Sequence, residues 1–281
     1  SRDGGENWQD ITPPQMPKEG TINTIELSAH DPGRAFVAVY KYRENDFSPY
    51  IFQTDDYGQS WRLLTSGQNS IPENHFVRVV REDPEKKGLL YAGTEFGMYV
   101  SFDEGASWQP FQRNLPVTPV TDMQVKGNDL VVATQGRSFW VLDDLSPLRQ
   151  LSADVMASNY HLFAPAQAFR TQLRGFRGGD APDPLPAPAL VYFMAKEGVD
   201  SLRLEMLDSQ GDVLKVFSTH PDKEKQESDL KVTPGLNRFE WRLTGQAPEI
   251  TPGSFFSLSY TGGPVLPPGD YQVRLCGAGE P

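Results

Sequence analysis

The chain has 281 residues, enough for one large all-β domain or two ordinary ones with a sizeable core. Its 37 acidic and 26 basic residues give a formal net charge of −11, and this excess repels a phosphate backbone and argues against nucleic acid as a partner. No stretch reaches the roughly 20 apolar residues that span a bilayer. The single cysteine, Cys276, excludes an internal disulfide, and the four histidines form no zinc pattern, so we expect no metal and no cofactor.

An eight-residue pattern, Ser/Thr-x-Asp-x-Gly-x-x-Trp, occurs three times, as SRDGGENW, TDDYGQSW and SFDEGASW. The hydroxyl and the carboxylate can accept backbone N–H bonds within a tight turn, and the glycine fits a position with positive φ. The tryptophan is expected to open the next strand and to cover the hairpin with its ring. The pattern residues are Ser1, Asp3, Gly5 and Trp8; Thr54, Asp56, Gly58 and Trp61; and Ser101, Asp103, Gly105 and Trp108.

The spacing of the three tryptophans, 53 and 47 residues, is typical of propeller blades with four strands each. Between them, residues 21–40, 74–94 and 119–135 each read as two apolar runs around a turn, which predicts the inner hairpin of a blade. The repeated pattern then becomes the turn between a third and a fourth strand. The 25 glycines and 24 prolines agree with many short strands joined by tight turns.

The repeated pattern resembles the Asp-box, or BNR repeat, of sialidase-like and sortilin-like propellers. This resemblance implies a partial propeller of three to four blades over residues 1–150. The last unit, VVATQGRSFWVLDDLSPLRQL, departs from the pattern because Leu145 replaces the glycine and no tryptophan follows. It resembles the closing blade of large bacterial propellers with WD40/YVTN/BNR-like repeats, a group named sortilin-like or glycosyl hydrolase-like. Thr121 and Gln135 stand where related sequences commonly carry histidine.

Residues 151–186 are predicted to form an Arg/Pro-rich connecting strap. Its three arginines, Arg170, Arg174 and Arg177, either bind an anionic ligand or, as we favour, lie along the acidic surface. Residues 187–281 alternate apolar and polar side chains in several short runs, which predicts a β-sandwich. The segments LEMLDSQGDVLKVFS, TPGLNRFEWRL and LPPGDYQVRL resemble the immunoglobulin-like domain of flagellar hook-capping proteins.

Propeller geometry divides the candidate residues between two faces. The Asp-box turns belong to the rim of one face, which favours a structural role. The loops of the opposite face could bind sugar or peptide, although a solvated polar rim is the simpler interpretation of any single residue there. Arg137 stands out because a long cation beside Gly136 can reach a carboxylate with two hydrogen bonds. The candidate binding residues are Tyr42, Arg43, Glu95, Phe96, Gln135 and Arg137.

Three functions remain open from the sequence. We favour a non-catalytic propeller that presents a protein- or glycan-binding face, with the immunoglobulin-like domain as a spacer or docking module. The alternative is a glycoside hydrolase that acts on polysaccharide through paired carboxylates. The available carboxylates are Glu95, Asp122, Asp143 and Asp144, and no spacing selects a pair. The third is a purely structural part of a large surface protein.

The chain lacks an initiating methionine and a signal peptide, and it opens inside a repeat. We therefore expect a C-terminal fragment of a longer protein whose upstream blades are its partners. The resemblance to secreted propellers implies an extracellular, periplasmic or cell-envelope location.

Overall fold

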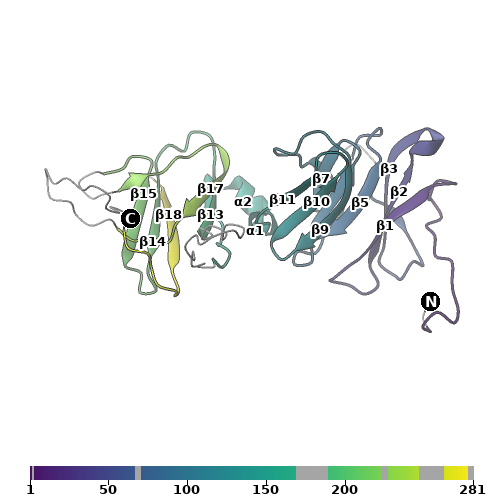
Figure 1. Cartoon of the computed structure of the whole chain (residues 1–281), viewed down its shortest axis with the longest axis horizontal. Coiled ribbons are helices and arrows are strands. Elements are labelled where there is room, and N and C mark those ends of the chain that lie inside the picture. Colours follow the sequence, from purple (N-terminus) through teal and green to yellow (C-terminus); the bar gives the residue numbers. More distant parts are fainter. Residues whose placement is uncertain (2, 67–70, 169–188, 223–226, 247–262, 278–281) are drawn as a thin grey trace, which may run out of the picture. The chain divides into compact units, whose positions relative to one another are not determined.

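The structure, a computed structural model, describes residues 1, 3–66, 71–168, 189–222, 227–246 and 263–277. The chain divides into two compact units, Ser1–Leu145 and Ser146–Pro281, each built mainly from antiparallel strands (Figure 1). The predicted all-β class is therefore confirmed. Arg170, Arg174 and Arg177 of the predicted strap lie outside the described residues.

The first unit contains three antiparallel sheets, named here blades 1 to 3, which follow one another in chain order (Figure 1). Blade 1 consists of β1 (Thr21–Leu27), β2 (Ala35–Lys41), β3 (Asp46–Thr54) and β4 (Arg62–Leu63). Blade 2 consists of β5 (Val77–Glu82), β6 (Leu90–Thr94), β7 (Gly97–Ser101) and β8 (Gln109–Pro110). Blade 3 consists of β9 (Val120–Lys126), β10 (Asp129–Thr134) and β11 (Phe139–Leu142).

The blades pack face to face because their strands carry β-branched and aromatic side chains toward the adjacent sheet. Between blades 1 and 2 the core contains Phe36 and Ile51 from one sheet and Val80 and Leu90 from the other, and all four side chains are fully buried. The successive, face-to-face sheets with in-order strands confirm a partial β-propeller. In each sheet the strands lie in chain order from the inner strand to the outer edge. The turns between second and third strands, β2–β3, β6–β7 and β10–β11, therefore lie at the same end of their blades.

The second unit contains two short helices and two sheets. The helices are α1 (Ser146–Gln150) and α2 (Ala153–Ala157). One sheet has the order β12 (Tyr160–Leu162), β13 (Ala189–Ala195) and β17 (Gly235–Trp241). The other has the order β16 (Ser228–Asp229), β15 (Val213–Ser218), β14 (Leu202–Leu207) and β18 (Gln272–Gly277), with a parallel β15–β16 pair.

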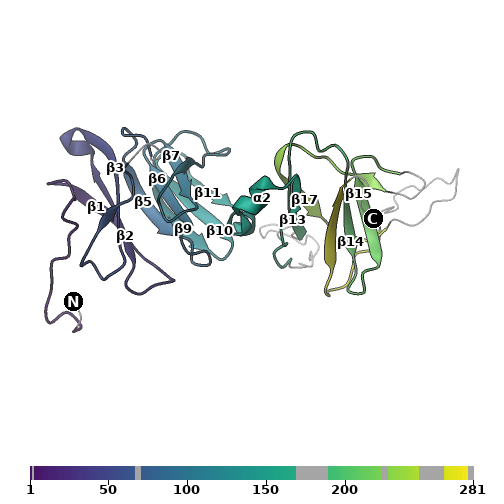
Figure 2. The ribbon, with the colours of Figure 1, turned by 180° about the vertical axis from the view of Figure 1, so that it is seen from behind.

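The two sheets of the second unit share one hydrophobic core, and Figure 2 shows β13 and β17 across from β14, β15 and β18. Val191 and Trp241 contribute from one sheet, and Leu204 and Met206 from the other. The buried carboxylate of Glu205, on β14, forms an ion pair with Arg274 on β18. The unit is thus a two-layered β-domain, and its assignment as immunoglobulin-like stays a prediction.

Candidate functional site

The turn between β2 and β3 presents two of the predicted binding residues. After β2 the chain forms a single 3₁₀ turn, Tyr42–Glu44, which ends at Asn45 with φ of 61°. Asparagine tolerates this left-handed conformation better than most residues, and its N–H donates to the carbonyl of Tyr42 at 3.1 Å. The tight turn places Tyr42 and the exposed Arg43 side by side at the end of blade 1, with the guanidinium 5.8 Å from the ring centre.

Tyr42 belongs to a cluster of aromatic and arginine side chains that joins blades 1 and 2. Its ring stacks on Phe76, with centroids 4.8 Å apart and planes 20° from parallel. Arg78, on β5, lies over both rings, with its guanidinium carbon 5.7 Å from the Tyr42 centroid and 5.1 Å from the Phe76 centroid. Flat rings that are held by stacking and a cation lose little conformational freedom when a ligand binds.

Glu95, at the β6–β7 turn, anchors this cluster. Its Oε2 accepts from Nε of Arg78 at 2.8 Å and also lies 2.7 Å from Nη2 of the same guanidinium, so one carboxylate oxygen meets two nitrogens. Both side chains are largely buried, at 17% and 27% exposed, so the pair fixes the guanidinium above the rings. We name Tyr42, Arg43, Phe76, Arg78 and Glu95 the aromatic–arginine cluster.

Phe96 extends the cluster along blade 2 through a histidine. The rings of His75 and Phe96 are 4.7 Å apart, and Phe96 is 42% exposed. Nδ1 of His75 lies 2.8 Å from the hydroxyl of Tyr99. Burial lowers the pKa of His75 and raises the pKa of Tyr99, so the two form a neutral hydrogen-bonded pair at neutral pH.

Gln135 and Arg137 lie on the corresponding turn of blade 3, between β10 and β11. Their side chains are exposed, and both residues form hydrogen bonds through their backbones. The N–H of Gln135 donates to Pro119 at 2.9 Å, and the carbonyl of Arg137 accepts from Trp140 at 2.8 Å. Within the part of the chain that the structure describes, no hydrogen bond, ion pair or ring contact joins either residue to the aromatic–arginine cluster. The structure therefore brings together four of the six predicted binding residues.

Sequence reasoning missed His75, Phe76 and Arg78. They precede or begin the inner strand of blade 2, in HFVRVVRE, and look there like ordinary strand residues. One signal was present, since Arg78 interrupts an apolar run at a bulge of the β5–β6 ladder. A bulge redirects one side chain away from its usual face. Asn23 occupies the equivalent bulge of blade 1, and its side-chain amide donates to the carbonyl of Arg78 at 2.5 Å.

Two of the carboxylates considered for glycoside hydrolysis are engaged in ion pairs. Glu95 is paired with Arg78, and Asp122 lies 2.7 Å from Nη2 of Arg81. Nη1 of that arginine also lies 2.9 Å from Glu26. Both carboxylates are therefore committed to guanidinium groups of neighbouring strands.

The three repeated turns share one hydrogen-bond pattern, shown here for the third. The hydroxyl of Ser101 accepts the N–H of Gly105 at 2.8 Å and donates to Oδ1 of Asp103 at 2.8 Å. The same oxygen of Asp103 accepts the N–H of Ser107 at 2.8 Å. Each side chain thus replaces a backbone partner inside the turn.

The other two turns repeat these bonds closely. In the second turn Gly58 donates to Thr54 at 2.8 Å, and Asp56 accepts from the hydroxyl of Thr54 at 2.8 Å. In the first turn Gly5 donates to Ser1 at 2.7 Å, and the hydroxyl of Ser1 donates to Asp3 at 2.8 Å. The hydroxyl, the carboxylate and the glycine N–H of the pattern bond to one another within each turn, and this geometry supports a structural role for them.

The second and third turns also contact the segment that follows the preceding pattern tryptophan. The indole N–H of Trp108 donates to the carbonyl of Leu64 at 3.2 Å, and that of Trp61 donates to Ile11 at 2.9 Å. Leu64 and Ile11 each stand three residues after the preceding pattern tryptophan, Trp61 and Trp8. The pattern glycine of each of these turns also lies against the side chain of the residue that accepts this bond: Gly105 against Leu64 and Gly58 against Ile11. We call the indole hydrogen bond and this glycine packing together the inter-blade contact.

Trp8 differs from the expectation that each pattern tryptophan covers its hairpin. It is 81% exposed, whereas Trp108 is 5% exposed, and its indole N–H donates to Gly5 of its own turn at 3.1 Å. The physical reason is that burial of the ring depends on a neighbouring sheet. The turn alone does not supply one.

The turn aspartates should make stability sensitive to acid. Hydrogen bonds from the side chain and then the backbone N–H of Ser60 lower the pKa of Asp56 from 3.8 to about 2. Bonds from Asn7, chiefly its backbone N–H, likewise lower the pKa of Asp3 to about 2. A depressed folded-state pKa gives stability that is complete above the unfolded value and is lost as pH falls through the folded one.

We therefore expect the thermal midpoint to fall between about pH 4 and pH 2, as measured by circular dichroism. Asp56→Asn should lower the midpoint at pH 7 and flatten this acid limb. Ser60→Ala, which keeps the carboxylate but removes a donor, should move the loss to higher pH. Superimposable acid limbs for all three proteins would contradict the assignment.

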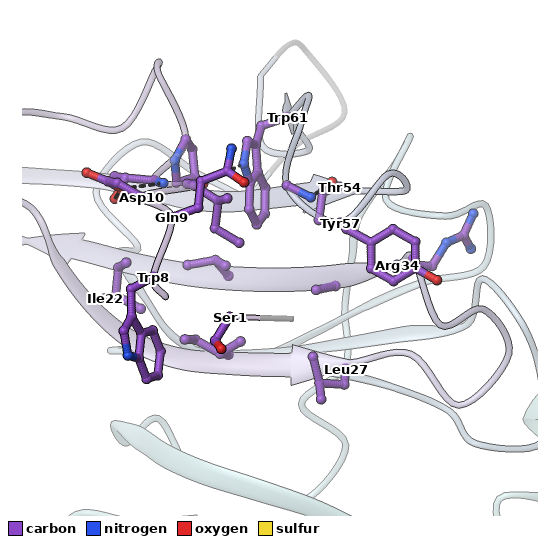
Figure 3. Close-up of a pocket in the computed structure, with 18 of the residues that line it drawn as sticks. Ser1, Trp8, Gln9, Asp10, Ile22, Leu27, Arg34, Thr54, Tyr57 and Trp61 are labelled. Atoms are coloured by element: carbon purple, nitrogen blue, oxygen red, sulfur yellow. Dashed lines mark hydrogen bonds between the residues drawn. The ribbon is translucent and has the colours of Figure 1, made fainter. Parts of the chain in front are cut away.

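Among the described residues, no group of three or more His, Cys, Asp or Glu side chains is placed to hold a metal ion. Within the same part of the chain, no helix has the length and apolarity to cross a membrane. A cavity of about 690 Å³ lies against the exposed side of blade 1, where Figure 3 shows Trp8, Ile22, Leu27 and Trp61 around it. It is lined by neither Tyr42 nor Glu95.

No protein-family model matches the chain. One similar solved structure is YCF48 bound to D1 peptide, at 19% identity over 50% of this chain and 43% of that chain, with a TM-score of 0.37. A GH74 enzyme of Niastella koreensis matches at 11% identity over 62% of this chain and 28% of that one, with a TM-score of 0.36. The GH74 xyloglucanase from Xanthomonas campestris matches at 14% identity over 86% and 32%, with a TM-score of 0.32. The chain thus spans less than half the length of each, and similarities at this level identify neither a family nor an activity.

Proposed function

We propose that the first unit is a non-catalytic binding module that binds a polypeptide through the aromatic–arginine cluster and Phe96. This proposal rests on one observation: turns and strands of two blades bring rings and guanidinium ions together in one preorganised group. Tyrosine and arginine anchors of this kind dominate the energetics of protein interfaces. The exposed Arg43 would pair with a ligand carboxylate, and the exposed ring of Phe96 would cover an apolar ligand side chain.

Two properties favour binding over catalysis at this site. The carboxylate nearest to the rings, Glu95, is held by Arg78 and so acts as a positioning group. The aspartates of the repeated turns are likewise committed to backbone N–H groups. Hydrolysis of polysaccharide by carboxylates of this chain together with further blades is the alternative, and the experiment below tests both.

The test is an array of 15-residue peptides and a glycan array, with hits measured by calorimetry on the full chain. We expect Arg43→Ala and Phe96→Ala each to weaken peptide binding by about tenfold or more, since anchor truncations cost about 1 to 3 kcal/mol. Arg137→Ala, an exposed arginine on the corresponding turn of blade 3, is the matched control and should bind like the parent. Glycan binding alone, or turnover of aryl glycosides, would overturn the polypeptide assignment.

For the second unit, we infer a role as an immunoglobulin-like spacer or docking module. Its separate core between two sheets supports this inference, because a domain with its own core can fold and move as a unit. We further infer an extracellular, periplasmic or cell-envelope location, which fractionation of the source cells would check. The sequence also predicts an upstream blade as a partner, and we infer that it would bind at a surface other than the aromatic–arginine cluster.

A further inference from the structure

The inner strand of blade 1 exposes a row of apolar side chains that blade 2 buries at matching positions. The positions of β1 and β5 can be matched by their bulges, because the register shift directly follows Ile22 in β1 and Val77 in β5. Ile25 is 62% exposed, whereas its counterpart Val80 is fully buried against blade 1. Leu27 is 74% exposed, whereas the counterpart in β5, Glu82, is 4% exposed. The side of blade 1 that points away from blade 2 is therefore an unpartnered blade face.

The residues that follow Trp8 are placed as a fourth strand. In blades 1 and 2 the two residues after the pattern tryptophan, Arg62–Leu63 and Gln109–Pro110, pair with the third strand of their own sheet. Gln9–Asp10 hold the same position after Trp8, and no strand pair of the described residues includes them.

Ile11 shows that this segment already holds the position of a blade edge. A methyl group at Gly58 would lie 2.7 Å from its Cδ1, just as one at Gly105 would lie 2.7 Å from Cδ1 of Leu64. Together with the indole bond from Trp61, this completes the inter-blade contact between residues 9–12 and blade 1. Residues 9–12 are thus seated on blade 1 as the segment after Trp61 is seated on blade 2, while Figure 3 shows Trp8, Ile22 and Leu27 around the open cavity beside them.

We propose that this face binds a three-stranded antiparallel β-sheet of the same repeat type, for which residues 9–12 serve as the fourth strand. Because β3 and β7 run directly into Thr54 and Ser101, the third strand of the bound sheet would run directly into Ser1. The sheet would fill the cavity of about 690 Å³ and cover Ile25, Leu27 and Trp8. Continuity with the contact between blades 1 and 2 selects this occupant, because the same strand positions are buried there by a sheet.

The full chain with a second copy of residues 20–53 joined directly to Ser1 tests the proposal, since the copy supplies β1 to β3 in register. We expect loss of acrylamide quenching of Trp8, isolated by subtracting the spectrum of the matching Trp8→Phe protein, and a blue shift of its emission. A second version carries a copy of residues 73–100, from blade 2, at the same place. Unchanged quenching of Trp8 in both versions would overturn the proposal.

The control changes Ile25→Glu and Leu27→Glu in the original β1. Both side chains are mostly exposed, so the unextended chain should keep its fold by circular dichroism, whereas the extended chain should lose the protection of Trp8. Protection that survives these changes would place the added sheet elsewhere and overturn the proposal. Sedimentation of the unextended chain provides the last arm, because concentration-dependent dimers that protect Trp8 would assign the face to a second copy instead. None of these readouts depends on peptide binding at the aromatic–arginine cluster.

Discussion

Replacing Arg34 by methionine is expected to destabilise the first unit by about 3 to 5 kcal/mol, the usual cost of removing one partner of a buried ion pair. Arg34 is 7% exposed and lies between two blades, with Nε 2.6 Å from Asp55 of blade 1 and Nη1 3.6 Å from Glu82 of blade 2. The side chain of Glu82 is 1% exposed, and its Oε2 has no hydrogen-bond partner. Without the guanidinium, this carboxylate would remain buried with the N–H of Gly88, 3.2 Å from Oε1, as a hydrogen-bond donor but without Arg34 to balance its charge.

Urea unfolding followed by tryptophan fluorescence, with the contribution of Trp108 isolated by subtracting the spectrum of the matching Trp108→Phe protein, measures the effect. The matched control is Arg62→Met, an exposed arginine in the same region, whose loss should cost about 0 to 1 kcal/mol. Adding Glu82→Met to Arg34→Met removes the orphaned charge and should restore most of the stability. Equal losses for Arg34→Met and Arg62→Met would show that the ion pair does not join the blades.

The repeated architecture could be predicted from sequence because its signal is local. Hydroxyl, carboxylate, glycine and tryptophan at fixed offsets specify a turn without help from distant residues. The structure places these turns at β3–β4 and β7–β8 with nearly identical bonds. Strand alternation in the second unit is equally local, and Leu204 and Trp241, two apolar residues of the alternating runs, are buried there.

The candidate binding site could be predicted only in part because it forms between blades. Tyr42 and Glu95 lie on turns whose place in a blade follows from the repeat. Their partners Phe76 and Arg78 reach them only because blade 2 packs on blade 1 and because a bulge redirects the arginine. The prediction that Trp8 covers its hairpin is wrong for the same reason. The same local motif leaves its ring exposed, because no sheet of the described residues covers it. Side-chain environment in this unit is thus set by neighbouring sheets as much as by the strand.

Gly105→Ala should destabilise the first unit by about 2 to 5 kcal/mol, because two separate costs coincide. The residue has φ of +81°, a left-handed conformation that costs an L side chain roughly 1 to 2 kcal/mol. The added methyl carbon would lie 2.7 Å from Cδ1 and 3.1 Å from Cβ of Leu64, and such overpacking costs about 1 to 3 kcal/mol. The substitution therefore strains the turn and pushes it away from the preceding blade.

Gly127→Ala separates the two costs. Gly127 also has positive φ, at +58°, but a methyl group there would meet nothing within 4 Å, so only the backbone cost of roughly 1 to 2 kcal/mol should appear. In the background Leu64→Ala, the cost of Gly105→Ala should fall toward that of Gly127→Ala, because Cδ1 of Leu64 is gone and only the 3.1 Å approach to Cβ remains, and the coupling energy measures the inter-blade contact. Urea midpoints at constant m-value provide the comparison. If Gly105→Ala matched Gly127→Ala in the parent chain, the turn would act within its own blade only, and packing of the pattern glycine would not hold consecutive blades in register.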